Sequence, residues 1–406
     1  MGQHREIPRD PAATIVDPVP PVDAALGATV AAVTTVRTAV RSTVDGVVRT
    51  TVLPKSPTLT SLPAVPPGSE RRFEPLQVLG EGGMGEVTLA EDRDIQRKVA
   101  VKRLRSDART APALARFAEE VRIIGQLEHP NITPVHDVGI DEEGQHYFVM
   151  KYVDGETLES IIAKLKAGEP GYAERYGADE RIEIFIGILN AVRYAHACGV
   201  VHRDLKPANI MVGRYGEVTV VDWGIAKKLG GAETDRGLIG TPLYMSPEQA
   251  AGDHPAIGER SDIYSLSLVL LELLSLQHPL SGKPNTEAVL ATLVTDGVDT
   301  GLMKLKFDLV GAGAPAEYAA LLSRGLQRDP ARRFGSVDEL EQALKDVREG
   351  NVPVSCHITL TKRAAGELIH FIDRSPWMFT AFFVAALAFF GAGSYLAIAR
   401  LINLLR

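Results

Sequence analysis

A cluster of glycines between two apolar runs constrains the N-terminal half of this chain more than any other feature. Residues 76–90 read LQVLGEGGMGEVTLA, in which Gly80, Gly82 and Gly85 have the spacing G-x-G-x-x-G and Val87 follows. Apolar runs of this length around a glycine cluster predict a strand, a tight loop and a second strand. Glycines let a backbone approach a polyphosphate closely and present N–H groups to it. The segment therefore predicts a strand–loop–strand unit that can cover phosphates.

The glycine spacing alone leaves an alternative open, because dinucleotide-binding turns share it. In those turns the glycines open a helix, whereas the strand-like residues EVTLA follow them here. Residues 99–102 read VAVK and begin twelve residues after Val87. Such a run is in most proteins an ordinary strand whose lysine reaches solvent. After a glycine loop of this kind it is typical of a lysine that contacts phosphates, which makes Lys102 a candidate.

A helix is predicted at residues 113–127, where apolar residues recur every three or four positions. The apolar positions are Leu114, Phe117, Val121, Ile124 and Leu127. Glu119 and Glu120 lie in the middle of this helix, where one of them can reach inward to Lys102. The alternative is that both glutamates face solvent.

Two later segments complete a set of motifs in fixed order. Residues 200–211 read VVHRDLKPANIM, and residues 218–224 read VTVVDWG. With the glycine loop and Lys102, these segments resemble the eukaryotic-type serine/threonine protein kinases, and most closely their bacterial membrane-attached group. The resemblance covers residues 73–345. It implies an α+β, two-lobed fold, with a small β-rich N-lobe and a larger α-helical C-lobe. It also implies ATP and Mg²⁺ as cofactors and proteins with Ser or Thr acceptors as substrates.

The resemblance assigns catalytic roles to four residues. Lys102 would pair with the α- and β-phosphates, and Glu120, the second glutamate of RFAEEV, would pair with Lys102. Asp204 would accept the proton of the substrate hydroxyl, and Lys206 would steady the γ-phosphate. This set suits phosphoryl transfer, which needs positioned cations and an oriented nucleophile rather than a covalent group from the protein.

The resemblance also implies the residues that hold the cofactors. Asn209 and Asp222 would hold Mg²⁺, which prefers oxygen ligands. Met150 would be the gatekeeper, and the backbone of Lys151 and Val153 would face the adenine. The implied nucleotide-binding residues are Leu79, Gly80, Glu81, Gly82, Gly83, Met84, Gly85, Val87, Ala100, Lys102, Met150, Lys151, Val153 and Met211. Three of them, Val87, Ala100 and Met211, would sandwich the adenine ring.

Further residues are implied to regulate or brace the domain. Thr234 is the candidate phosphosite, where a phosphate would pair with Arg203. The alternative is an unmodified loop threonine. Thr241 and Ser246 fall in the part that resembles the peptide-docking loop of the family, where they would be structural. Glu248 would form a structural ion pair with Arg333. Asp262 would brace the catalytic loop from a buried helix.

The chain departs from the family pattern at four places. Trp223 replaces the usual Phe after Asp222, Ser246 stands where Ala is usual, and Ser267 stands where Gly is usual. Residues 164–180, KLKAGEPGYAERYGADE, make a long polar connection that we expect to be a loop, with a partner surface as the alternative. None of these changes removes an implied catalytic residue, so a pseudokinase or nucleotide-binding scaffold is the rival function rather than the first choice. A signalling adaptor whose tail binds partners is a third reading that is compatible with catalysis.

The residues before the resemblance have a different composition. Residues 1–72 hold 10 of the 25 prolines and no Phe, Tyr or Trp, so they have little with which to form a core and are predicted to be disordered. Residues 26–47 also place apolar side chains at helical spacing, but many of them are valines and two glycines interrupt the pattern. Helix formation there on a partner or a membrane surface is the weaker alternative.

The charges divide unevenly along the chain. The net charge is −7, made up of +2 in residues 1–72, −11 in residues 73–345 and +2 in residues 346–406. This acidic balance argues against a nucleic-acid partner, since a protein that contacts phosphates usually carries the opposite excess. Two cysteines in 406 residues exclude a disulfide framework and a cysteine-rich zinc module.

An uncharged run near the C-terminus predicts a membrane span. Residues 375–399 contain no charged side chain, and as a helix they would reach roughly 37 Å, more than the roughly 30 Å of a bilayer core. The alternative is a buried core helix. Residues 346–374 would then be a juxtamembrane segment and residues 400–406 a short tail, with the kinase-like region on the cytoplasmic side. Tethering to a membrane would favour a homodimer for trans-autophosphorylation.

Overall fold

The computed structural model describes residues 72–81, 85–105, 110–141, 144–228, 240–298 and 316–351, with scattered positions between 372 and 400. Several predictions concern residues outside these ranges. They are the disordered tail at residues 1–71, the loop residues Gly82, Gly83 and Met84, the phosphosite Thr234, and most of the segment from residue 352 to the end. Among the residues that the structure describes, no helix combines the length and hydropathy needed to cross a bilayer.

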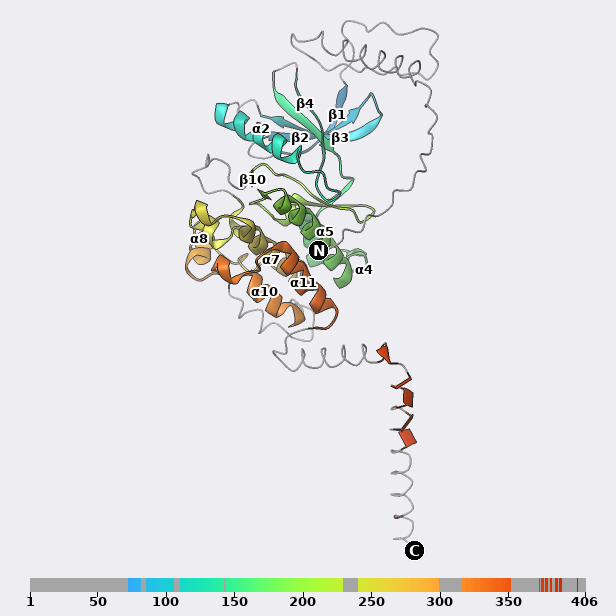
Figure 1. The fold of residues 1–406 in the computed structure, drawn as a ribbon. Coiled ribbons are helices and arrows are strands. Elements are labelled where there is room, and N and C mark those ends of the chain that lie inside the picture. Colours follow the sequence, from blue (N-terminus) through green and yellow to red (C-terminus); the bar gives the residue numbers. More distant parts are fainter. Residues whose placement is uncertain are drawn as a thin grey trace, which may run out of the picture.

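Five antiparallel strands and one helix form the upper lobe in Figure 1. The strands lie in the order β1-β2-β3-β5-β4. Their bounds are Phe73–Glu81 for β1, Gly85–Asp92 for β2, Arg97–Leu104 for β3, Val135–Ile140 for β4 and His146–Lys151 for β5. Helix α2 spans Ala111–Ile124. The strand–loop–strand unit and the following lysine strand are therefore confirmed.

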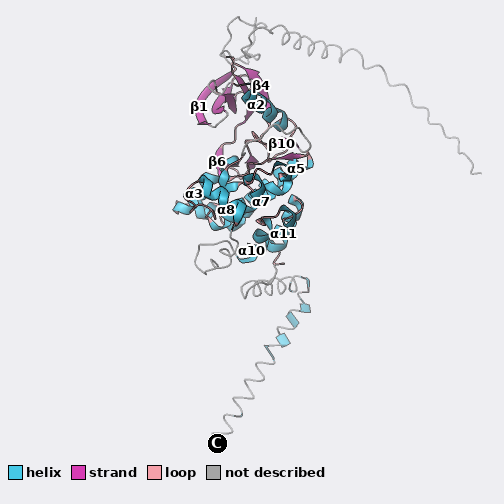
Figure 2. Cartoon of the chain, turned by 90° about the vertical axis from the view of Figure 1, so that its left-hand side faces the viewer, coloured by secondary structure: helices cyan, strands magenta, loops and turns pink. Residues whose placement is uncertain are grey.

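The lower lobe is mainly helical, as the cyan elements of Figure 2 show. Its helices are α3 Leu158–Ala167, α4 Tyr172–Arg175, α5 Ala178–Ala197, α6 Pro247–Ala250, α7 Glu259–Ser275, α8 Thr286–Thr295, α10 Ala319–Gly325 and α11 Val337–Arg348. Short strands lie against them, namely β6 Gly155–Thr157, β8 Ile210–Gly213 and β9 Val218–Val220 in one sheet, and β7 Val200–Val201 paired with β10 Lys227–Lys228. Single 3₁₀ turns are η1 Pro207–Asn209, η2 Pro242–Tyr244, η3 His254–Ala256, η4 Ala316–Tyr318 and η5 Pro330–Arg332. The predicted α+β architecture with a β-rich and a helical lobe is confirmed.

Local sequence signals set the bounds of α2. The side chain of Thr110 accepts a hydrogen bond from the backbone N–H of Ala113, and Pro112 occupies the first turn. The helix therefore begins two residues before the predicted start. It ends at Ile124, three residues before the predicted end, and the Gly125 backbone N–H bonds the backbone oxygen of Val121 as the cap. These bounds place Glu120 in the third turn, on the side that faces β3.

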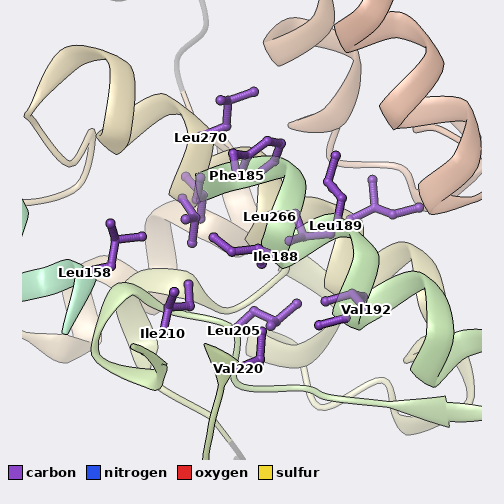
Figure 3. Packing of buried hydrophobic residues seen from close by; sticks show 14 of the residues in the cluster. Leu158, Phe185, Ile188, Leu189, Val192, Leu205, Ile210, Val220, Leu266 and Leu270 are labelled. Atoms are coloured by element: carbon purple, nitrogen blue, oxygen red, sulfur yellow. The ribbon is translucent and has the colours of Figure 1, made fainter. Parts of the chain in front are cut away.

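The core of the lower lobe forms where α5 packs against α7. Phe185, Ile188, Leu189 and Val192 have the i, i+3, i+4, i+7 spacing that places them on one face of α5. Figure 3 shows this face against Leu266 and Leu270 of α7, with Leu205, Ile210 and Val220 below it. Each fully buried side chain of this kind contributes about 1.5–3 kcal/mol. The apolar contact fixes the loops that enter and leave β7, β8 and β9, which carry the candidate site.

The prediction of a loop at residues 164–180 was wrong. This stretch contains the end of α3, all of α4 and the start of α5. Gly168 ends α3 in the left-handed conformation, at φ 68°. Leu158, Ile161 and Ile162 bury one face of α3. Lys164 and the hydroxyl of Tyr172 both bond Glu156, at 2.5 and 2.6 Å, so a polar network joins the end of α3 to α4.

Candidate active site

Three charged groups meet between the two lobes. The Lys102 Nζ atom donates to Glu120 Oε1 at 2.6 Å and to Asp222 Oδ1 at 3.0 Å. Glu120 is buried and Lys102 nearly so, whereas the Asp222 side chain is 46% exposed. The predicted pairing of Lys102 with Glu120 is confirmed. The other candidate, Glu119, is exposed and lies 3.8 Å from Arg122 on the outer side of α2.

The strand register explains how Lys102 reaches this position. Lys102 lies opposite Val87 of β2 and Phe148 of β5, and Ala100 lies opposite Met150. Residues opposite each other, and residues two apart on one strand, share a face of the sheet. Val87, Ala100, Lys102 and Met150 therefore face the same side, which is the side of α2. The predicted contacts to an adenine and to its phosphates can thus come from one continuous surface.

Burial and neighbouring charges have opposite effects on the pKa values of the three groups in this cluster. Burial by itself would lower the pKa of Lys102, but the carboxylates of Glu120 and Asp222 outweigh it and raise that pKa. Burial raises the pKa of Glu120 in spite of the neighbouring ammonium group. Burial would also raise the pKa of Asp222, but Lys102 holds it below the ordinary value. Lys102 is therefore a fixed cation and Asp222 a fixed anion near neutral pH.

A second cluster lies on the loop between β7 and β8. Lys206 Nζ donates to Asp204 Oδ2 at 2.8 Å and to Thr241 Oγ1 at 2.6 Å. The Thr241 backbone N–H and its hydroxyl both donate to Asp204 Oδ1, each at 2.8 Å. The Asn209 amide nitrogen donates to the backbone oxygen of Asp204 at 2.9 Å and to Oδ2 at 3.2 Å. The Asp204 carboxylate is thus held in one orientation from several sides.

A buried carboxylate fixes the backbone of this loop. Asp262 of α7 accepts hydrogen bonds from the backbone N–H groups of His202 and Arg203, at 2.8 and 2.9 Å. His196 Nε2 lies 2.8 Å from the same carboxylate. The predicted bracing role of Asp262 is confirmed. The braced loop holds Arg203 at φ 71°, a conformation that side chains other than glycine adopt only when the surroundings impose it.

The donor set around Asp222 fits magnesium better than a transition metal. Asn209 uses its amide nitrogen on Asp204, which leaves the amide oxygen as the ligand atom. Asp222 contributes a half-exposed carboxylate and has φ 58°, again an imposed conformation. Among the described residues, no group of three His, Cys, Asp or Glu side chains is arranged to hold a metal ion. One carboxylate and one amide suit Mg²⁺, which keeps waters and takes further oxygens from phosphates.

Comparison with known proteins agrees with this geometry. The family model described as "Protein kinase domain" matches residues 73–346. The chain belongs to the protein kinase family. A probable serine/threonine-protein kinase of Streptomyces coelicolor is 37% identical over 313 residues, which is 75% of this chain and 44% of that protein.

Other relatives give a similar result. The serine/threonine-protein kinase PknD of Chlamydia trachomatis is 32% identical over 71% of this chain and 33% of its own length. A probable serine/threonine-protein kinase PknB of Bifidobacterium longum is 33% identical over 73% of this chain and 42% of its own length. The chain spans less than half the length of these curated relatives.

Most of the predicted site residues lie in or beside the two clusters. Lys102, Glu120, Asp204, Lys206, Asn209 and Asp222 form the two clusters above, and Val87, Ala100 and Met150 lie on the face of Lys102. Leu79, Gly80 and Glu81 lie at the end of β1, and Gly85 begins β2. Lys151 ends β5, Val153 is buried just after it, and Met211 lies on β8. The structure does not test their contact with a nucleotide.

Sequence reasoning missed two contacts of the kinase site. Thr241 was predicted to be only structural, but its hydroxyl bonds both Asp204 and Lys206. His196 was not singled out, although it contacts Asp262 across 66 positions of sequence. The available signal for Thr241 was that its segment, residues 240–242 (Gly-Thr-Pro), follows the His202-Arg203-Asp204 segment in the order seen in the family. The sequence offered no comparable signal for His196.

Two departures from the kinase pattern are accommodated in the core. Trp223 is fully buried, and its ring lies 4.5 Å from that of His202 in the catalytic loop. The larger ring therefore anchors the residue next to Asp222 against the loop of Asp204. The Ser267 hydroxyl donates to the backbone oxygen of Ile263 at 2.8 Å.

Proposed function

We propose that this chain transfers the γ-phosphate of ATP to Ser or Thr hydroxyls of protein substrates. The observation that carries the proposal is the complete pair of clusters, Lys102–Glu120–Asp222 and Asp204–Lys206–Asn209, held together between the lobes. The relatives named serine/threonine-protein kinases support the same activity. ATP and Mg²⁺ are the cofactors that this donor set fits.

The roles of the residues follow from their charges and positions. Asp204 orients the substrate hydroxyl and takes its proton as the oxygen bonds to phosphorus. Lys206, held 2.8 Å from Asp204, holds the transferred phosphoryl group and balances its charge. Lys102, held by Glu120, positions the α- and β-phosphates, and Asp222 with Asn209 would hold Mg²⁺. The metal, when bound, supplies positive charge to the phosphate oxygens.

The rival function is a pseudokinase that binds nucleotide without transfer. That function would be favoured if a member of the two clusters were missing or turned away. Here Asp204 is oriented by Thr241 and Asn209, and Lys102 is paired, as transfer requires. We therefore place the pseudokinase second.

The location and regulation of the kinase are also proposals. The uncharged residues 375–399, with Trp377 near one end and Tyr395 near the other, support a single membrane span with the kinase domain on the cytoplasmic side. Thr234 is the proposed site of regulatory autophosphorylation. Membrane tethering would raise the local concentration of kinase domains and favour trans-autophosphorylation in a homodimer.

The trans reaction can be tested with the full chain in lipid vesicles. Diluting the protein with lipid at constant bulk concentration should lower the rate of autophosphorylation per molecule, because fewer kinase domains meet. A rate that does not change with surface density would show that the reaction occurs within one molecule. Phosphopeptide mapping of active protein without phosphate on Thr234 would remove that residue as the site.

The first test of the activity uses the full chain with Mg·ATP and a basic test protein as acceptor. Asp204→Asn should lower phosphate transfer by about 10²- to 10⁴-fold, because it removes the proton acceptor. ATP binding, measured by calorimetry, should stay close to that of the wild type. The matched control is Asp338→Asn on α11, an aspartate that is 70% exposed and remote from the site, and its activity should not change.

Two results would contradict the proposal. Equal transfer by wild type and Asp204→Asn would refute the role of Asp204. ATP binding by the wild type without transfer to any Ser or Thr, including its own, would favour the pseudokinase.

A further inference from the structure

Gln249 of α6 is a buried polar residue that the catalytic roles given above do not use. It is 3% exposed. Its amide nitrogen, Nε2, donates to the backbone oxygen of Arg203 at 2.8 Å. Its amide oxygen, Oε1, accepts from the backbone N–H of Ser246 at 3.1 Å and from the Ser246 hydroxyl at 3.0 Å. Gln249 therefore joins the start of α6 to the loop between β7 and β8.

The Arg203 backbone oxygen belongs to the peptide group that leads into Asp204. The N–H of the same peptide group donates to His202 Nδ1 at 3.3 Å. The preceding peptide group is also held, since the Arg203 N–H donates to Asp262 at 2.9 Å. Arg203 has φ 71°, which a residue with a side chain adopts only when its surroundings impose it. Gln249 is thus one of the groups that fix the strained backbone beside Asp204.

The segment that leads into α6 also contacts Asp204. The backbone N–H and the hydroxyl of Thr241 both donate to Asp204 Oδ1. A Cβ atom at Gly240 would lie 3.1 Å from the Arg203 backbone oxygen, so this glycine lets the segment pass close to the oxygen that Gln249 bonds. One continuous stretch of chain therefore holds both the carboxylate of Asp204 and the peptide group before it.

A simpler role for Gln249 is to cap α6. It is the third residue of this four-residue helix, where a Gln side chain often accepts from the backbone N–H of the residue before the helix, here Ser246. The cap uses only the amide oxygen. The bond from the amide nitrogen leaves the helix and ends on the catalytic loop, 46 positions away in sequence. Capping therefore explains the oxygen of Gln249 but not its nitrogen.

We propose that Gln249 is a positioning residue for phosphate transfer, which acts by holding the peptide group before Asp204. The inference rests on the proposed kinase activity and adds a residue to it. Without the amide nitrogen, the Arg203 oxygen loses this donor and the peptide group can rotate toward a less strained backbone. That rotation moves the Asp204 carboxylate away from the substrate hydroxyl, and a misplacement of about 1 Å can lower a rate about a hundredfold.

Steady-state kinetics of the full chain with Mg·ATP and a basic test protein measure this role. Gln249→Met keeps the length of the side chain and removes both its donor and its acceptor. It should lower kcat, corrected for the folded fraction from urea unfolding, about 10- to 100-fold and leave the KM for ATP within about twofold. The matched control is Gln327→Met, which should keep the wild-type kcat. Gln327 also donates its amide nitrogen to a backbone oxygen, that of Ser323 at 2.9 Å, outside the two clusters.

A second background shows whether Gln249 acts through Asp204. In Asp204→Asn, the addition of Gln249→Met should cause little further loss of kcat, because the carboxylate that Gln249 positions is already absent. A general loss of structure would instead lower kcat by the same factor in both backgrounds. Equal factors would overturn the proposal.

Hydrogen exchange gives a readout that does not need catalysis. The Arg203 amide, which bonds Asp262, should exchange about tenfold faster in Gln249→Met than in the wild type and in Gln327→Met. Gln249→Glu keeps an oxygen for the Ser246 N–H and lacks the amide donor, so it gives the same comparison if Gln249→Met does not fold.

A wild-type kcat in the folded Gln249 variant would overturn the proposal. A lower kcat without faster exchange would also overturn it, because the loss would then not come from a loosened loop. A lower kcat with faster exchange, and with little further loss in Asp204→Asn, supports it. A wild type without any transfer would refute the proposed function itself, which this comparison of variants keeps apart from a failure of the inference.

Discussion

Carboxylates serve opposite purposes in the catalytic site and in the helical scaffold behind it. In the scaffold, both oxygens of Glu248 accept from Arg333 at 2.8 Å, and both side chains are buried. In the catalytic site, Asp222 meets Lys102 through one oxygen and is 46% exposed. Both are pairs of a carboxylate with a cationic side chain, but the degree of pairing within the protein differs.

The fully paired carboxylate is suited to holding the fold, and the partly exposed one is suited to binding a ligand. The Arg333 guanidinium has five N–H donors, and the structure gives it five bonds, to Glu248 twice and to the backbone oxygens of Gln327, Arg260 and Arg328. A group paired so fully can only hold its surroundings in place. The Asp222 carboxylate keeps exposed surface, which leaves it able to contact a metal ion. Burial and full pairing therefore distinguish Glu248 from Asp222.

The largest effect on stability is expected from Arg333→Met. This change leaves the Glu248 carboxylate buried without its cation, which typically costs about 3–5 kcal/mol. The loss should appear as a lower urea midpoint with little change in slope. The hydrogen bonds of Arg333 go to Glu248 and to the backbone of Gln327, Arg260 and Arg328, all outside the two clusters, so the protein that remains folded should retain the ATP affinity of the wild type.

A surface pair provides the control for Arg333. Arg348 lies 2.9 Å from Glu183, and both side chains are at least 40% exposed. Arg348→Met should therefore cost at most about 1 kcal/mol. Equal losses for the two variants would break the comparison, because burial and full pairing would then have no special effect.

A smaller loss is expected where the scaffold backbone packs closely. A Cβ atom at Gly325 of α10 would lie 2.0 Å from the Ser267 hydroxyl oxygen of α7. Gly325→Ala should therefore destabilise the protein by about 1–3 kcal/mol, as overpacking does. The catalytic region offers the contrast, since a Cβ atom at Gly80 would meet nothing within 4 Å and Gly80→Ala should leave stability nearly unchanged.

Adding Ser267→Gly to Gly325→Ala tests the cause of this loss. Ser267→Gly removes the hydroxyl that a Cβ atom at Gly325 would meet. The double variant should recover most of the stability that Gly325→Ala loses. Urea unfolding of the wild type, the two single variants and the double variant measures the coupling free energy between the two positions. If the serine change gives no recovery, the clash with Ser267 is not the reason.

The sequence predicted the members of the catalytic clusters better than their contacts. Lys102, Asp204 and Asp222 lie in short motifs whose residues are fixed by local spacing, so a linear reading finds them. The bond from Thr241 to Asp204 joins positions 37 apart, and it depends on the path of the chain between them. That path is set by tertiary packing, which spacing does not encode.

The same limit applies to the fold. The strands around the glycine loop and helix α2 follow an apolar period and were predicted. Helix α4 has four residues and none of them is buried, so the sequence carried no helical stripe there. Its position depends on the bonds of Tyr172 and Lys164 to Glu156. Polar networks of this kind are specific in three dimensions and weak as one-dimensional patterns.

The last expected effect is a difference between the two regions in how their carboxylates make the stability of the protein depend on pH. Burial would raise the pKa of Glu248, but the Arg333 guanidinium and the Ser261 hydroxyl lower it from 4.5. Folded protein then binds fewer protons at this site than unfolded protein. The stability that Glu248 contributes is present above pH 4.5 and is lost as the pH falls through the folded-state pKa. At Glu120 burial wins and the pKa is raised, so its contribution is present below pH 4.5 and is lost as the pH rises.

Urea unfolding of the wild type, Glu248→Gln and Glu120→Gln between about pH 3.5 and 7 measures both contributions. The stability difference between wild type and Glu248→Gln should grow with rising pH, and the difference between wild type and Glu120→Gln should shrink. Each variant lacks one titrating carboxyl, so the other acids of the protein cancel in these differences. Slopes of the same sign would contradict the distinction between a carboxylate stabilised by full pairing and one that is strained by burial at the catalytic lysine. Opposite slopes would show that the scaffold stabilises the charged form of its carboxylate while the catalytic site holds a charge at a cost to stability.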